Sequence, residues 1–145
     1  MIVYLDASAL VKRYIAEAHS DEVRELIASA EAVGTATISR AEGWAAFARA
    51  ARMALVTPDE AAAALRALDA DWENLIRVQV TEALVRRAAA LAWEQALRGY
   101  DAVHLSAALI WRETLSEPVS VATFDRQLWH GAKVSGLGAW PAVVP

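Results

Sequence analysis

Short segments rich in β-branched and other apolar residues alternate along this chain with longer segments of helical periodicity. The short segments have the length and composition of β-strands. Two strands that are separated by a helix normally lie parallel in one sheet, because the helix carries the chain back across it. Strands are predicted at residues 1–5, 33–38, 75–80 and 119–123, with an edge strand in the tail that contains Gly136 and Gly138.

Helical segments fill the intervals between these strands, singly or in pairs. Residues 57–60 (TPDE), for example, have the sequence of a capping box with proline at the first helical position. Helices on both faces of a sheet make a three-layer α/β/α architecture. The chain is therefore predicted to be an α/β protein with one domain, residues 1–145, and a mostly parallel central sheet. Helices are predicted at about residues 8–16, 20–30, 39–53, 58–72, 81–97, 100–113 and 126–133.

The composition excludes several classes of protein. The chain has no cysteine, so it has no disulfide framework, thiolate nucleophile or cysteine-ligated metal. No apolar run approaches the ~20 residues of a membrane-spanning helix, and residues 1–6 lack the basic leader of a signal peptide. A cytoplasmic protein without membrane contact is expected. The 18 acidic and 14 basic residues give a net charge of -4, which argues against nucleic-acid binding by a generally basic surface.

Four acidic residues are predicted to meet at one edge of the sheet. Asp6 directly follows the first strand, and Asp125 comes two residues after the fourth. Glu42 lies in the first turn of the helix after the second strand, and Asp101 lies at the start of a later helix. Parallel sheets bind ligands at the carboxyl ends of their strands, and clustered carboxylates need a cation. Carboxylate ligands favour Mg²⁺ or Mn²⁺, which activate water for attack on a phosphodiester.

Each of these acids also has an ordinary structural interpretation. Glu42 completes a capping box with Ser39, Asp125 is suited to cap the last helix, and Asp101 lies favourably near a helix N-terminus. Asp6 is different, because a carboxylate directly after a buried strand must find a partner. Without these four acids, acidic and basic residues balance at 14 each, so the whole net charge can be assigned to the predicted metal site.

Four segments of the chain, in order, resemble the signature segments of the PIN-domain family. They are residues 5–10 (LDASAL), 39–42 (SRAE), 100–108 (YDAVHLSAA) and 122–125 (ATFD). The likeness is strongest to the VapC toxins of type II toxin–antitoxin modules. It implies a three-layer α/β/α fold, Mg²⁺- or Mn²⁺-dependent endoribonuclease activity on an RNA substrate, inhibition by a cognate VapB-type antitoxin, and a homodimer.

By this resemblance, Asp6, Glu42, Asp101 and Asp125 match the acidic quartet that binds the metal. Ser8 and Thr123 match hydroxyl positions beside the first and fourth acids, where they would orient a carboxylate or a water. Their ordinary interpretations are a helix cap for Ser8 and a β-branched strand residue for Thr123. The pair Trp129-His130 departs from the family pattern, in which smaller residues are expected in the last helix.

Other polar and apolar residues are given mainly structural roles. His104 lies one turn after Asp101 on the same helix face and is expected to pack in the core or at its rim. The helices at about 40–54 and 58–72 carry apolar residues that pack in the core, and by resemblance this hairpin is also the groove for an antitoxin helix. Basic residues near the predicted edge are solvated or hold RNA phosphates: Lys12, Arg13, Arg40 and Arg126.

Other classes of protein share parts of this pattern. A phosphoacceptor receiver domain also places acids around Mg²⁺, but it needs a lysine after its last strand, and neither Lys12 nor Lys133 is so placed. A haloacid-dehalogenase-like phosphatase needs an aspartate where this chain has Ser8. A non-catalytic PIN-like module is a further alternative, and the complete acidic quartet argues against it.

Overall fold

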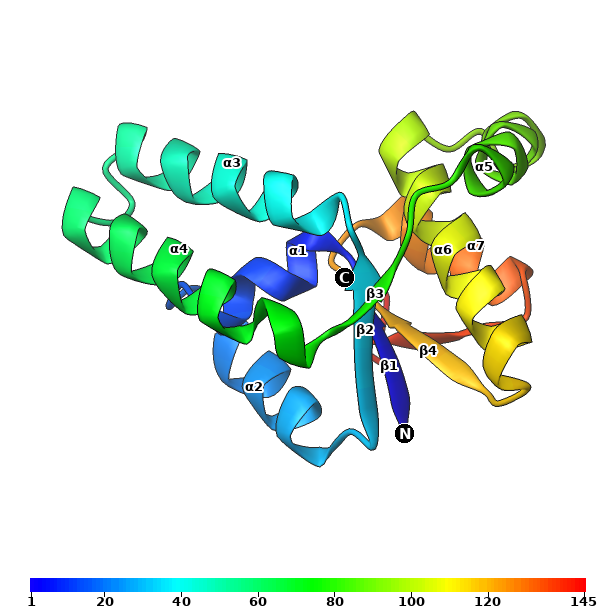
Figure 1. Cartoon of the computed structure of the whole chain (residues 1–145), viewed down its shortest axis with the longest axis horizontal. Coiled ribbons are helices and arrows are strands. Elements are labelled where there is room, and N and C mark those ends of the chain that lie inside the picture. The colour runs from blue at the N-terminus through cyan, green and yellow to red at the C-terminus, as the bar shows by residue number, and fades with distance from the viewer.

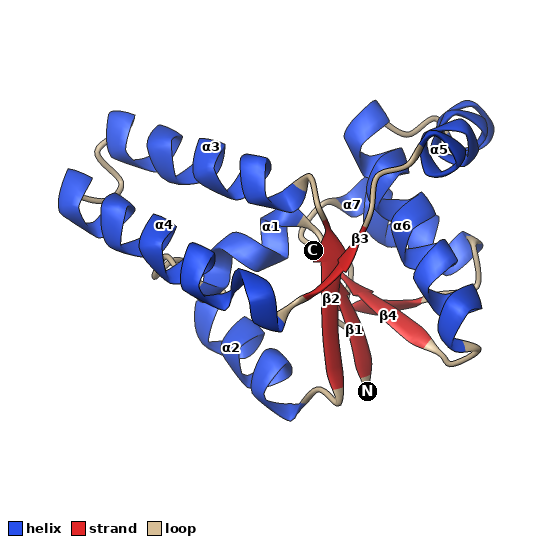
Figure 2. Ribbon diagram, viewed as in Figure 1, coloured by secondary structure: helices blue, strands red, loops and turns tan.

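A five-stranded parallel sheet forms the centre of the computed structural model, which describes all residues 1–145 (Figure 2). The strand order is β3-β2-β1-β4-β5, and every neighbouring pair is parallel, as the alternation of strands and helices predicted. The short edge strand predicted in the tail is β5. The strands are β1 (Ile2–Leu5), β2 (Ala32–Ala36), β3 (Ile76–Val78), β4 (Val119–Ala122) and β5 (Gly138–Trp140).

Seven α-helices cover the two faces of this sheet and make three layers (Figure 1). Helices α1 to α4 lie on one face, and α5 to α7 lie on the other. The longest helix, α6, packs most extensively on α5. The helices are α1 (Ala7–Leu10), α2 (Ser20–Ser29), α3 (Ser39–Arg52), α4 (Pro58–Asp71), α5 (Glu82–Gln95), α6 (Gly99–Leu115) and α7 (Arg126–Val134), with 3₁₀ turns η1 (Val11–Arg13) and η2 (Trp72–Asn74).

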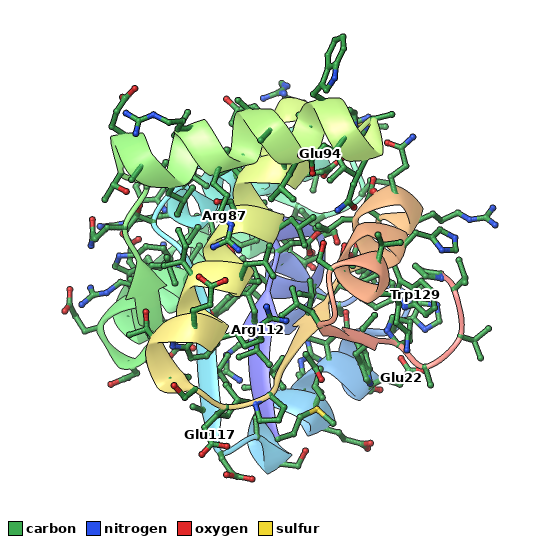
Figure 3. The ribbon with its side chains drawn as sticks, turned by 90° about the vertical axis from the view of Figure 1, so that its right-hand side faces the viewer. Glu22, Arg87, Glu94, Arg112, Glu117 and Trp129 are labelled. Atoms are coloured by element: carbon green, nitrogen blue, oxygen red, sulfur yellow. The ribbon has the colours of Figure 1, made fainter.

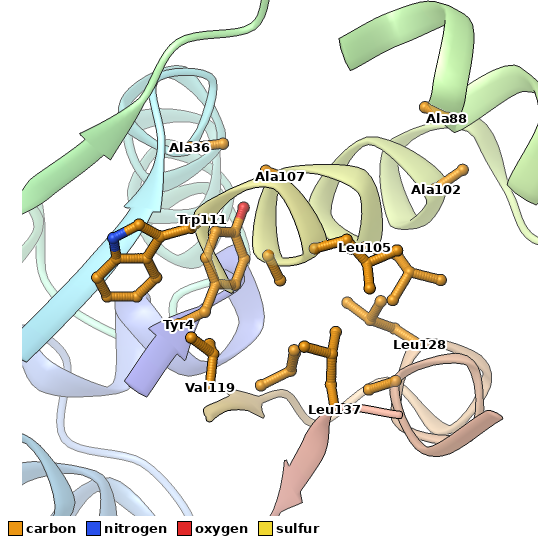
Figure 4. Close-up of a cluster of buried hydrophobic side chains, with 14 of the residues drawn as sticks. Tyr4, Ala36, Ala88, Ala102, Leu105, Ala107, Trp111, Val119, Leu128 and Leu137 are labelled. Carbon is orange, nitrogen blue, oxygen red and sulfur yellow. The ribbon is translucent and has the colours of Figure 1, made fainter. Parts of the chain in front are cut away.

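The central strand β1 supplies side chains to two separate cores. Successive strand residues point to opposite faces, so Val3 and Leu5 pack under α1 to α4 whereas Tyr4 packs under α5 to α7. Figure 4 shows Tyr4 beside Trp111 in the second of these cores. Val3, Tyr4 and Leu5 have no exposed surface. The strand that leads into Asp6 is therefore fixed from both sides.

The first helix differs from its prediction at both ends. Its cap residue is Asp6 and not Ser8, because the Asp6 carboxylate accepts from the Ala9 N–H at 2.9 Å. The regular α-helix ends at Leu10 and continues as the 3₁₀ turn η1 to Arg13, short of the expected end near residue 16. The Ser8 hydroxyl is thus free to bond elsewhere.

Two side chains labelled in Figure 3 hold the C-terminal segment against the helices. The Trp129 indole N–H donates to the carbonyl of Pro141 at 2.8 Å, and Arg112 donates to the carbonyls of Ser135 and Gly136 at 3.2 and 3.1 Å. Trp129 is buried and therefore has a packing role at the position where the sequence departs from the family pattern. None of the helices has the length and apolar character that crossing a membrane requires.

Gly34 in β2 is predicted to tolerate no side chain. A Cβ atom at this position would lie 2.8 Å from two ring atoms of the buried Trp111. We expect Gly34→Ala to lower the free energy of unfolding by about 1–3 kcal/mol, the usual cost of overpacking, in urea titrations. Gly99→Ala is the control, because its Cβ would have no neighbour within 4 Å. Equal stability of both variants would contradict the prediction.

Candidate active site

The carboxyl ends of β1 and β4 lie side by side and position the first group of candidate residues. Leu5 pairs with Ala122 in the sheet, so Asp6 and Thr123 leave it at the same edge. Helix α3 starts after β2 at this edge and brings Glu42, while α6 brings Asp101 in its first turn (Figure 1). The fold therefore collects residues from four distant parts of the chain.

Asp6 is almost fully buried and has both carboxylate oxygens engaged. Oδ1 accepts from the Ser8 hydroxyl at 2.7 Å and from the Ala9 N–H at 2.9 Å. Oδ2 accepts from the Thr123 hydroxyl at 2.6 Å. Burial raises the pKa of Asp6 above its ordinary value, although the positive charge of His104 and the two hydroxyl hydrogen bonds lower it. The site thus contains a buried carboxylate that its protein partners compensate only in part.

The Ser8 and Thr123 hydroxyls each have a second partner. Ser8 Oγ accepts from the Phe124 N–H at 2.8 Å, and Thr123 Oγ1 accepts from the Asp125 N–H at 3.0 Å. Each hydroxyl therefore donates to Asp6 and accepts from the loop between β4 and α7. The two side chains connect the turns that follow β1 and β4, and they fix the orientation of the Asp6 carboxylate.

Glu42 is held by a histidine and not by a helix cap. The expected capping box with Ser39 is wrong: Ser39 is the first residue of α3, and its buried hydroxyl contacts the Thr35 hydroxyl at 2.6 Å. Glu42 Oε1 instead accepts from His104 Nε2 at 2.7 Å. The other ring nitrogen, Nδ1, is hydrogen-bonded to the buried Tyr4 hydroxyl at 2.8 Å.

This chain of contacts affects the pKa of His104. Burial lowers the pKa of the imidazole, but the hydrogen bond to Glu42 and the charges of Asp6, Glu42 and Asp101 outweigh burial, so the pKa is raised. His104 is 2% exposed, in agreement with its expected place in the core or at its rim. What the sequence did not reveal is that its partner is one of the candidate metal ligands.

Asp101 and Asp125 share a single arginine. Arg98, the residue before α6, donates from Nε to Asp101 Oδ2 at 3.0 Å and from Nη2 to Asp125 Oδ2. The other oxygen of Asp125, Oδ1, caps α7 by accepting from the Leu128 N–H at 2.9 Å, as predicted. Burial is the main cause that raises the pKa of Asp101, and the charge of Asp125 adds to it. Sequence reasoning missed Arg98, which is the N-cap residue of α6 and lies three residues before Asp101.

The chemistry of these donors fits a hard divalent cation. The site offers carboxylate oxygens and no sulfur, and burial raises the pKa of both Asp6 and Asp101, so a bound cation would favour their charged forms. Glu42 and Asp101 line a cavity of about 690 Å³, and Asp125 lines a second cavity of about 570 Å³. No three acidic or histidine side chains converge closely enough to hold one ion in this arrangement. Arg98 lines both cavities, with its guanidinium bonded to the acid pair.

The chain is similar to known proteins over nearly its full length. Residues 3–133 match the PIN domain. Ribonuclease VapC45 of Mycobacterium tuberculosis is 37% identical over 142 residues, which is 97% of this chain and 96% of that protein. Among solved structures, VapC20 of Mycobacterium tuberculosis superposes with a TM-score of 0.65 at 18% identity, covering 99% of both chains. VapBC2 of Rickettsia felis gives 0.63 at 14% identity, covering 96% of this chain and 97% of that one.

The fold and the acids at its sheet edge therefore define a PIN-domain protein, and the chain belongs to that family. Within the family it is a relative of the VapC ribonucleases, as the four sequence segments predicted. PIN-domain nucleases of the VapC type generally depend on a divalent metal ion.

Asp6→Asn is expected to stabilise the protein at neutral pH. The asparagine Oδ1 can keep the bonds from Ser8 and Ala9, and its amide can donate to Thr123. Because the folded pKa of Asp6 is raised, the native state binds more protons than the unfolded state between the unfolded pKa and the folded pKa. Stability is therefore lost as pH rises through that window, and asparagine avoids the loss. We expect a gain of about 0.5–2 kcal/mol in urea unfolding at pH 7.

The gain should shrink as pH falls below the raised pKa of Asp6, since the carboxyl is then neutral in the native state. Asp59→Asn removes the same charge from an exposed position and serves as the control. An Asp6→Asn variant that is less stable than wild type at pH 7 would contradict the prediction.

Proposed function

We propose that this protein is a metal-dependent endoribonuclease and the toxin of a VapBC-type toxin–antitoxin module. The observation that carries this proposal is the placement of Asp6, Glu42, Asp101 and Asp125 on turns and helix starts at one edge of the sheet, in a chain similar to Ribonuclease VapC45 over almost its whole length. The four acids would be the ligands of Mg²⁺ or Mn²⁺. The substrate would be RNA, and the location would be the cytoplasm.

The protein's own residues have distinct roles in this proposal. Ser8 and Thr123 hold the Asp6 carboxylate in one orientation through hydrogen bonds of 2.7 and 2.6 Å. His104 orients Glu42 in the same way. A divalent ion bound there would lower the pKa of an attacking water and stabilise the negative charge that develops on the phosphodiester. No side chain is required as nucleophile.

The basic residues near the edge differ in their availability for RNA. Three of the four are already paired: Lys12 with Glu17, Arg13 with Asp71 and Arg40 with Asp69. Arg126 is exposed and makes no ion pair, so it is the one of these four that is free for a phosphate. Neither lysine bonds to any of the four acids, which argues against a receiver-like site: Lys133 lies over the Trp129 ring and Lys12 over Phe124.

An antitoxin would bind a groove between η1 and α3, the first helix of the predicted hairpin; the second helix, α4, does not line this groove. This groove, of about 540 Å³, is lined mainly by apolar side chains that include Val11, Ala46 and Ala50, and Met53 and Leu55 at its end are exposed. An amphipathic helix has the complementary shape and surface. The Rickettsia felis neighbour is named as a VapBC pair, which supports this partner class. A homodimer stays a prediction.

Asp6→Asn is expected to reduce RNA cleavage by about 100-fold or more, because metal-centred stabilisation is worth several kcal/mol and each 1.4 kcal/mol is a factor of ten. EDTA should abolish wild-type cleavage, and added Mg²⁺ or Mn²⁺ should restore it. Asp59→Asn, exposed and away from the site, is the control and should cleave like wild type. Full activity of purified Asp6→Asn would refute the assignment.

Ala50→Arg places a charged side chain in the groove and should weaken antitoxin binding by about tenfold or more, since an unpaired charge there costs over 1.4 kcal/mol. The antitoxin tested is the product of the reading frame next to the gene. Co-expression should then no longer relieve the growth arrest caused by this variant. Ala48→Arg, on an exposed part of the same helix, is the matched control and should still be neutralised. Growth arrest that is equally relieved for both variants would rule out this groove.

A further inference from the structure

Arg98 is the only lysine or arginine that bonds to any of the four acids. It contacts two of them, Asp101 in α6 and Asp125, the cap residue of α7, which are 24 residues apart in sequence. Both carboxylates raise the pKa of Arg98 further above its usual value, with Asp101 as the larger cause. One positive charge therefore bridges two negative charges at the mouth of the site.

Arg98 competes with a metal ion for one oxygen of each acid. Asp125 Oδ1 is committed to capping α7, so Oδ2 is its remaining acceptor, and Arg98 donates to it. Arg98 also donates to Asp101 Oδ2. Release of Arg98 would free both of these oxygens for a divalent cation. Release of Arg98 has a small free-energy cost, because its side chain is 71% exposed and exposed ion pairs contribute little to stability.

A released Arg98 stays next to the substrate space. It lines the cavity that contains Glu42 and Asp101, and it also lines the neighbouring cavity that contains Asp125 and Arg126. Its five N–H donors form a planar fork that matches two phosphate oxygens. A guanidinium at this junction is suited to bind a phosphate of an RNA strand that crosses from one cavity to the other.

We infer that Arg98 is an exchangeable counter-ion, which neutralises Asp101 and Asp125 until the metal binds and then binds a phosphate of the RNA. This inference rests on the proposed metal site. It assigns Arg98 two successive partners: the acid pair in the metal-free protein, and a backbone phosphate in the loaded complex. Substitution of Arg98 should therefore have opposite effects on the two ligands.

The first test measures Mn²⁺ binding without RNA, by electron paramagnetic resonance of the free ion. Arg98→Gln should bind Mn²⁺ about three- to tenfold more tightly than wild type, because it no longer competes for the acid pair. Arg126→Gln removes an equal charge close by without breaking an ion pair, so its affinity should change less. Affinity that is unchanged or lower in Arg98→Gln would overturn the inference and make Arg98 a structural brace.

The second test measures RNA binding in Ca²⁺, with a short mixed-sequence single-stranded RNA. Arg98→Gln should bind this RNA about three- to tenfold more weakly, and the slope of log affinity against log salt should fall by about one. RNA affinity and salt slope equal to those of wild type would overturn the second half of the inference. A structural brace would weaken Mn²⁺ and RNA binding together.

The two proposals fail in different ways. If the wild-type protein binds no Mn²⁺, the proposed metal site is refuted, and the exchange that depends on this site is refuted with it. Wild-type protein that binds Mn²⁺ while Arg98→Gln binds it no better would leave the ribonuclease proposal intact and refute only the exchange. Thermal unfolding of each variant verifies that the measured protein is folded.

Discussion

The buried carboxylate of Asp6 is the interaction around which the rest of the site is arranged. An ionised group in this position requires hydrogen-bond donors, and the chain supplies them from the turn after β1 and from the end of β4. Ser8 and Thr123 also accept hydrogen bonds from backbone N–H groups of the loop after β4, so the turns after β1 and β4 cannot move independently. The hydrogen bonds that Asp6 receives therefore also help to fix the position of Asp125, because Thr123 bonds to both residues.

The sheet and the location of the acids could be predicted because both follow from local pattern. Asp6 comes directly after an apolar strand, and the carboxyl ends of parallel strands share one edge. The partners of Glu42 could not be predicted in this way. The local pattern offered Ser39, three residues away, whereas the structure uses His104, 62 residues away on another helix. Side-chain pairing across layers depends on packing that no local spacing encodes.

The charge of the site is also more balanced than the sequence suggested. The four acids equal the net charge of -4, which favoured an uncompensated acidic pocket. The structure adds Arg98 between Asp101 and Asp125, and it adds a His104 whose raised pKa favours the charged form. Positive groups of the protein thus offset part of the repulsion among the acids. Burial nevertheless keeps the pKa values of Asp6 and Asp101 above their ordinary values.

The hydrogen-bonded line from Tyr4 through His104 to Glu42 has a consequence for how this protein can evolve. Both imidazole nitrogens are committed, and Tyr4 is locked among core side chains on the central strand. A substitution at any one of the three positions leaves a buried polar atom without a hydrogen-bond partner unless the other positions change too. Substitutions in the core beneath α6 are thereby coupled to the placement of the Glu42 carboxylate. Related sequences should therefore vary at these three positions together.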